Sequence, residues 1–124
     1  MRILLTGALG FTGRHFEEKA AQSGHEILPL SANLLDAAAI EREVDQTGPV
    51  DAVVHLAAIA FVGHAHDAEL YAVNTVGTSN LLAALSTRPA KDRPGRLLIA
   101  SSANVYGNSD TSPISEDQPP APTN

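Results

Sequence analysis

A glycine-rich turn near the N-terminus constrains the fold of this chain more than any other feature. It joins a short apolar run, residues 2–6, to a stretch at 11–23 in which apolar residues recur at helical spacing. Its glycines are Gly7, Gly10 and Gly13. Glycines at these positions allow a tight turn with positive φ and a close approach of the helix to the strand. The pattern predicts a buried parallel strand, a turn and a helix.

The alternation of apolar runs and helical periodicity continues along the chain. Further strands are predicted at 25–30, 50–56 and 96–100, the last of them buried, and further helices at 35–46 and 67–85. Pro29 cannot donate to a ladder, so the second strand is expected at an edge or to end there. Strands that alternate with helices over short connections predict right-handed crossovers and a parallel sheet covered on both faces. We expect an α/β fold, a Rossmann-type doubly wound parallel sheet.

The glycine turn also suggests a ligand. Free N–H groups at the start of the helix and the positive end of its dipole would face a pyrophosphate. The alternative is a turn that only connects two elements. Because the flanking strand, the helix and the following strand–helix units are all present, the pattern favours binding of a dinucleotide, NAD or NADP.

Composition excludes several other classes of protein. The net charge is −6 and the isoelectric point is about 5.2, which argues against a partner with a phosphate backbone. No apolar run approaches the ~18–20 residues that span a bilayer. The chain has no cysteine, which removes disulfides and zinc–thiolate sites and is compatible with the cytoplasm. We expect a cytoplasmic protein that binds neither nucleic acid nor membrane.

The chain resembles the extended short-chain dehydrogenase/reductases, the NAD-dependent epimerase/dehydratase family. The Gly-x-x-Gly-x-x-Gly spacing with Phe11 matches the family's turn, and His55-Leu56-Ala57-Ala58 matches a motif that lines the cofactor. Residues 73–82 resemble the helix whose asparagine, here Asn74, supports the active site. Residues 101–107 resemble the catalytic-serine segment. The four matches occur in the family's order.

The resemblance implies hydride transfer at a carbonyl or hydroxyl of a nucleotide sugar. It assigns catalytic roles to Ser102, which would polarise the sugar oxygen, and to Asn74. It implies that the following residues bind the cofactor: Gly7, Gly10, Phe11, Thr12, Gly13, Asn33, Leu34, Leu56, Ala57, Ala58 and Ser101. From the residues alone, the favoured interpretation is that Ser101 and Ser102 cap the end of a strand. No metal site is expected, and His64 and His66 are interpreted as surface residues.

Three details narrow the resemblance. Ala103 and Asn104 stand where sugar-nucleotide dehydratases carry acidic residues, which leaves a reductase or an epimerase. The second strand runs into residues 33–36 with no intervening helix, as in sugar-nucleotide reductases such as the GDP-4-keto-6-deoxymannose reductases. Residues 31–33 offer neither the acidic residue typical of NAD binders nor the arginine typical of NADP binders. Asn33 and Asp36 could contact adenine or cap the next helix.

The family's Tyr-x-x-x-Lys pair is absent, because Tyr71 is followed four residues on by Thr75 and Tyr106 by Asp110. We expect residues 1–107 to be the N-terminal part of an NAD(P)-binding Rossmann domain. Residues 108–124, rich in proline and serine, would form a loop leading toward the catalytic helix. The fold would then be truncated before that helix and the substrate domain, and this fragment would be inactive.

Two further expectations concern the complete protein. The helix at 67–85 resembles one that relatives pack into a dimer interface, which implies a homodimer. An alternative from another class is a non-catalytic module of the same fold that senses NAD(P) and regulates a partner. It would explain the missing pair without truncation.

Overall fold

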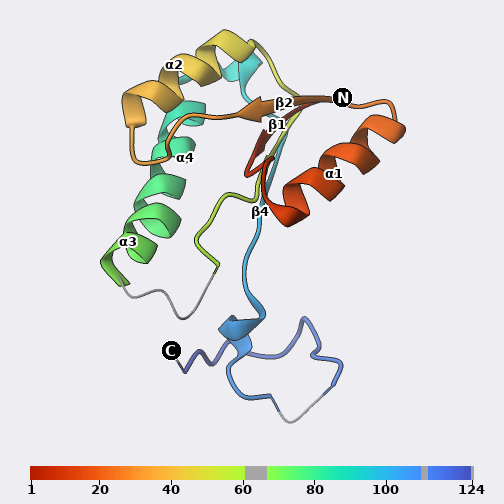
Figure 1. Cartoon of the computed structure of the whole chain (residues 1–124), viewed down its shortest axis with the longest axis vertical. Helices are drawn as coiled ribbons and strands as arrows, with labels where there is room; N and C mark the ends of the chain where they lie inside the picture. The colour runs from red at the N-terminus through yellow and green to blue at the C-terminus, as the bar shows by residue number, and fades with distance from the viewer. Residues whose placement is uncertain (61–66, 110–111, 124) are drawn as a thin grey trace.

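The computed structural model describes residues 1–60, 67–109 and 112–123. Its centre is a sheet of four parallel strands in the order β2-β1-β3-β4 (Figure 1). The strands are β1 (Arg2–Thr6), β2 (Glu26–Leu30), β3 (Ala52–His55) and β4 (Arg96–Ile99). All four were expected from the sequence, and the parallel, Rossmann-like arrangement is confirmed.

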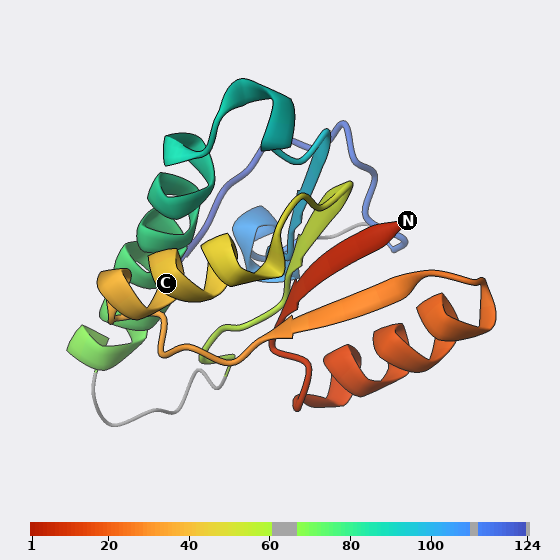
Figure 2. The same ribbon diagram turned by 90° about the horizontal axis from the view of Figure 1, so that it is seen from above.

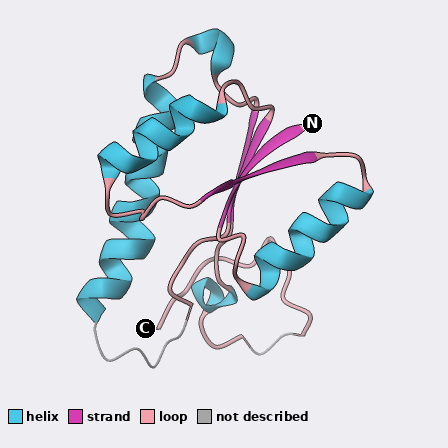
Figure 3. Ribbon diagram, turned by 45° about the horizontal axis from the view of Figure 1, so that its top comes forward, coloured by secondary structure: helices cyan, strands magenta, loops and turns pink. Residues whose placement is uncertain are grey.

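Helices cover both faces of the sheet, which twists as parallel sheets do (Figures 2 and 3). Helix α1 (Phe11–Gln22) lies on one face, and α2 (Ala37–Thr47) and α4 (Thr78–Thr87) lie on the other. Because successive side chains of a strand point to opposite faces of the sheet, β1 contributes side chains to two hydrophobic cores. Leu4 is buried on the α2–α4 side, and Ile3 and Leu5 are buried on the α1 side.

The chain is helical from Asp67 to Thr87, as the sequence predicts, but it is not one regular α-helix. Helix α3 (Asp67–Tyr71) and α4 are joined by a π-helical segment, Ala72–Gly77. Gly77 lies where a Cβ would come within 2.8 Å of the Leu34 side chain, so glycine lets this helix approach the segment between β2 and α2. None of the described helices is long and apolar enough to cross a membrane.

The expected burial of the fourth strand is wrong. Leu97, Leu98 and Ile99 are 42%, 54% and 45% exposed. The reason is position: among the described residues β4 is the edge strand beside β3, and α1 packs over the other half of the sheet. An open, mainly apolar hollow of about 560 Å³ lies beside it. An apolar run in the sequence does not indicate whether another element covers the strand that it forms.

Two short 3-10 turns flank β4, Ala90–Asp92 and Ala103–Tyr106. The described residues from 108 onward contain no helix or strand. This segment lies beyond the carboxyl end of β4 (Figure 1). Pro29 lies in β2, the other edge strand of the sheet, in agreement with its expected edge position.

Candidate functional site: the carboxyl ends of the strands

The turn between β1 and α1 needs its glycines for different reasons. Gly7 has φ +74°, and its carbonyl accepts the N–H of Gly10 at 3.0 Å. A Cβ on Gly13 would lie 2.0 Å from that carbonyl oxygen and 2.8 Å from the Cα of Ala8. A Cβ on Gly10 would meet only the Gly7 oxygen, at 3.2 Å. Gly7 thus supplies the positive φ and Gly13 the close approach of the helix to the turn, while a Cβ on Gly10 would meet a single atom in one tight contact.

The N-terminus of α1 is open toward solvent. Gly10 is its N-cap, and within the described chain no side chain caps the first turn and no acidic residue lies in it. Phe11 is 82% exposed, and its ring lies 4.6 Å from that of His15; Thr12 is also exposed. Free N–H groups and the positive helix end suit a bound phosphate group.

The segment after β3 lies directly against this turn. A Cβ on Gly7 would be 2.7 Å from the backbone nitrogen of Ala57 and 2.9 Å from the carbonyl carbon of Leu56. The N–H of Ala57 donates to Thr6 Oγ1 at 3.1 Å. The structure therefore brings together the two segments that the family resemblance assigns to the cofactor, the glycine turn and residues 56–58.

Asn74 holds the backbone that follows. Its Oδ1 accepts the N–H of Ile59 at 2.8 Å, and its Nδ2 donates to the Ile59 carbonyl at 3.0 Å. Asn74 lies within the π-helical segment, and π-bulges are frequent at functional sites. The asparagine thus supports the strand-end segment by a two-point contact with its backbone.

A buried histidine lies beneath these elements. His55, 4% exposed, places Nδ1 2.6 Å from Thr6 Oγ1 and Nε2 2.9 Å from Thr78 Oγ1. Thr78 Oγ1 in turn donates to the carbonyl of Asn74 at 2.7 Å. Burial lowers the pKa of His55 from its ordinary value of 6.5. The sequence marks this histidine as part of a motif, but its partners come from two other elements.

The lowered pKa of His55 predicts a loss of stability in acid. The unfolded imidazole takes up a proton near pH 6.5, whereas the folded one does so only at lower pH. The contribution of His55 to the free energy of unfolding is therefore complete above pH 6.5. It declines as the pH falls below 6.5, by at most about 1.4 kcal/mol per pH unit. Urea unfolding at pH 7.5 and pH 5 should show a larger acid loss for the parent chain than for His55→Gln. Equal losses would contradict the assignment.

The segment between β2 and α2 is ordered by local contacts. Asp36 caps α2 by accepting the N–H of Ala39, and Asn33 Oδ1 accepts the N–H of Leu35, both at 2.9 Å. Leu34 is 7% exposed in the core, and its carbonyl accepts from Asn80 Nδ2. The capping alternative holds for Asp36. The Leu34 side chain packs inward, so any contact of this residue with a ligand would involve backbone.

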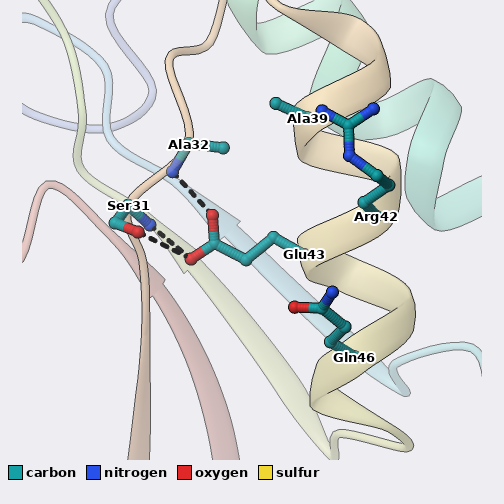
Figure 4. Close-up of a pocket in the computed structure, with 6 residues that line it drawn as sticks. All are labelled: Ser31, Ala32, Ala39, Arg42, Glu43 and Gln46. Carbon is teal, nitrogen blue, oxygen red and sulfur yellow. Dashed lines mark hydrogen bonds between the residues drawn. The ribbon is translucent and has the colours of Figure 1, made fainter.

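A carboxylate that no sequence motif indicates lies at the end of β2. Glu43 of α2 accepts the N–H of Ser31 at 2.7 Å, the Ser31 hydroxyl at 2.9 Å and the N–H of Ala32 at 2.7 Å (Figure 4). The contact lies in an open hollow of about 390 Å³ between β2 and α2. No local motif could have identified it, because the contact spans the β2–α2 connection.

Ser101 and Ser102 follow β4 and are exposed. Ser102 Oγ accepts the N–H of Asn104 at 3.2 Å and so caps the Ala103–Tyr106 turn. A hydroxyl that accepts one N–H still has its own proton to donate. The capping role and the catalytic role are therefore compatible for Ser102.

His64 and His66 lie outside the described residues. Among those that the structure does describe, no group of three or more His, Cys, Asp or Glu side chains could hold a metal ion.

The parallel sheet, the helices on both faces and the glycine turn before an open helix N-terminus define a Rossmann-type α/β domain. The chain belongs to the NAD dependent epimerase/dehydratase family, whose model matches residues 3–124. The resemblance to extended short-chain dehydrogenase/reductases is thereby confirmed.

Several individual proteins and solved structures are similar to this chain. The chain is 31% identical to a GDP-6-deoxy-D-talose 4-dehydrogenase of Aggregatibacter actinomycetemcomitans, over 100% of this chain and 43% of that protein. A short-chain dehydrogenase/reductase superfamily protein of Agrobacterium tumefaciens with bound NAD superposes with a TM-score of 0.80 at 27% identity, covering 100% of this chain and 40% of that one. The NAD complex of the UDP-glucose 4-epimerase of Thermus thermophilus gives 0.82 at 27% identity, with 98% and 45% covered. The chain thus spans less than half the length of these relatives.

Proposed function

We propose that this chain is the NAD-binding portion of a nucleotide-sugar reductase or epimerase. The packing of Ala57 against Gly7, beside the uncapped start of α1, is the observation that supports it most. Together the two segments would form a backbone site for a pyrophosphate, in which Gly7 and Gly13 permit the close packing of the backbone and Gly10 places no side chain at the start of α1. Relatives with bound NAD and the family assignment support NAD as the ligand.

Glu43 supports NAD over NADP. In Rossmann domains, residues near the end of the second strand contact the 2′ position of the adenosine ribose. Here the carboxylate of Glu43 accepts the N–H groups of Ser31 and Ala32 at that strand end. Its negative charge would repel a 2′-phosphate. We expect Glu43→Gln to narrow the ratio of NAD to NADP affinity by about fivefold, on the order of 1 kcal/mol. Glu41→Gln on the same helix is the matched control and should leave the ratio unchanged. A ratio unaffected by Glu43→Gln in fluorescence titrations would reject the role.

For the reaction, NAD supplies a nicotinamide that accepts or gives a hydride. The residues of this chain would bind and orient it, and the Ser102 hydroxyl would donate a hydrogen bond to the sugar oxygen. The proton-transfer tyrosine and its lysine would come from sequence beyond residue 124. The isolated chain would then bind NAD without turning over any nucleotide sugar. Turnover by purified 1–124 would refute this division of roles.

The alternative function is a regulatory module that senses NAD(P) without catalysis. The exposed Ser102 after β4 favours the enzyme over this module. A Tyr-x-x-x-Lys pair shortly after residue 124 would support the enzyme, and an early stop would support the sensor. For the complete enzyme we also propose a cytoplasmic homodimer that uses the helix at 67–85 at its interface.

A further inference from the structure

Both ring nitrogens of His55 bond to threonine hydroxyls, and the donors around them determine which nitrogen holds the proton. Thr78 gives its single hydroxyl proton to the carbonyl oxygen of Asn74, 2.7 Å away, and a carbonyl can only accept. The 2.9 Å contact between Thr78 Oγ1 and His55 Nε2 therefore needs Nε2–H as its donor.

The other ring nitrogen of His55, Nδ1, is then most stable without a proton. Thr6 Oγ1 accepts the N–H of Ala57 at 3.1 Å and lies 2.6 Å from His55 Nδ1. With Nδ1 unprotonated, Thr6 donates to it and every proton of the chain of bonds has an acceptor. A proton on Nδ1 would deprive the buried Thr6 hydroxyl of its acceptor and would place a charge on a ring that is 4% exposed. Both changes are costly in a buried site.

The chain of bonds joins two parts of the candidate site. At one end, Thr6 precedes Gly7 and holds Ala57 against it. At the other, Thr78 bonds to Asn74, whose side chain holds both backbone groups of Ile59. The imidazole of His55 is the link between them.

We propose that His55, in its Nε2–H tautomer, is a positioning residue that holds the 57–59 backbone against the glycine turn and thereby sets the affinity for NAD. The statement about affinity rests on the proposed function. His55 acts through Thr6 and Thr78, and its buried ring is not itself a contact for the ligand.

The tautomer can be read directly, without NAD. Long-range ¹H–¹⁵N spectra of the labelled 124-residue chain at pH 7.5 should show His55 with Nε2 protonated and Nδ1 bare. An Nδ1–H tautomer or a doubly protonated ring would overturn the proposal. This measurement is independent of whether the chain binds NAD.

Substitutions of Thr78 test the link. Thr78→Val keeps the shape and removes the hydroxyl, whereas Thr78→Ser restores it. We expect Thr78→Val to accelerate amide exchange at Ile59 and to weaken NAD binding about tenfold, and Thr78→Ser to behave like the parent. Thr87→Val is the matched control, because Thr87 makes the same kind of bond to a helix carbonyl, that of Ala84 at 2.9 Å, and it should change neither.

The outcomes separate the two proposals. A folded Thr78→Val variant with parent exchange at Ile59 and parent NAD affinity would overturn the positioning role. If the parent chain itself fails to bind NAD, the proposed function fails, while the tautomer and the exchange at Ile59 still decide whether His55 positions the 57–59 backbone.

Discussion

Replacing Gly13 by valine should abolish dinucleotide binding by the 124-residue chain. The sequence suggests that the new side chain would enter the pyrophosphate space. The structure adds a more severe cause, since a Cβ at this position would lie 2.0 Å from the Gly7 carbonyl oxygen. The first turn of α1 must therefore move away from β1, and the N–H groups that face the phosphate move with it. Calorimetric titration with NAD should give no detectable heat of binding.

Two matched substitutions separate this effect from a general loss of stability. Gly24 has φ +74° and no atom within 4 Å of a Cβ, so Gly24→Ala strains a turn far from the site, by on the order of 1 kcal/mol, and should leave NAD affinity unchanged. Gly10→Ala, whose Cβ would meet one atom, the Gly7 oxygen at 3.2 Å, should fold with a small shift of that carbonyl and still weaken binding by obstructing the ligand. A folded Gly13→Val with parent affinity would rule out the turn as the phosphate site.

Replacing Ser102 by alanine should lower turnover of a longer, active protein by about a hundredfold, because a donor aimed at the reacting oxygen is lost. The cofactor affinity should change by less than about twofold, since the hydroxyl is assigned to the sugar and not to NAD. Steady-state kinetics with the nucleotide sugar and a separate NAD titration would measure the two effects.

Ser86→Ala is the matched control for this substitution. Its hydroxyl bonds to a helix carbonyl, that of Ala83 at 2.8 Å, and lies on α4 instead of after a strand end. It should leave turnover at the parent value. Full activity of Ser102→Ala would reduce Ser102 to its observed role, the cap of the Ala103–Tyr106 turn.

The features predictable from sequence were those set by local chemistry. The strand before Gly7, the helix after Gly10 and the cap at Asp36 each follow from a few adjacent residues, and all are present. The exposure of β4 was not predictable, because Leu97-Leu98-Ile99 has the pattern of a buried run whether or not a neighbour covers it. The π-helical segment Ala72–Gly77 within the expected helix was likewise not predicted.

The residues of the candidate site likewise fall into two groups, those that the sequence indicates and those that the structure alone identifies. The spacing of the glycines suggested the turn, and the family resemblance implied residues 56–58 and Asn74; the structure places them against one another or on a shared backbone segment. The roles of Glu43 and of the threonine partners of His55 depend on contacts between distant elements, with 12 residues separating Glu43 from Ser31 and 49 separating His55 from Thr6. A residue pattern within one segment does not predict contacts between residues so far apart in the sequence.

NAD is expected to bind at the turn between β1 and α1. Titration of the ¹⁵N-labelled chain with NAD tests it most directly, with the amide shifts followed residue by residue. We expect saturable changes that are largest at residues 10–13 and 56–58, and small changes at β4 and at 112–123. Shifts that do not saturate, or that cluster away from the glycine turn, would contradict the account.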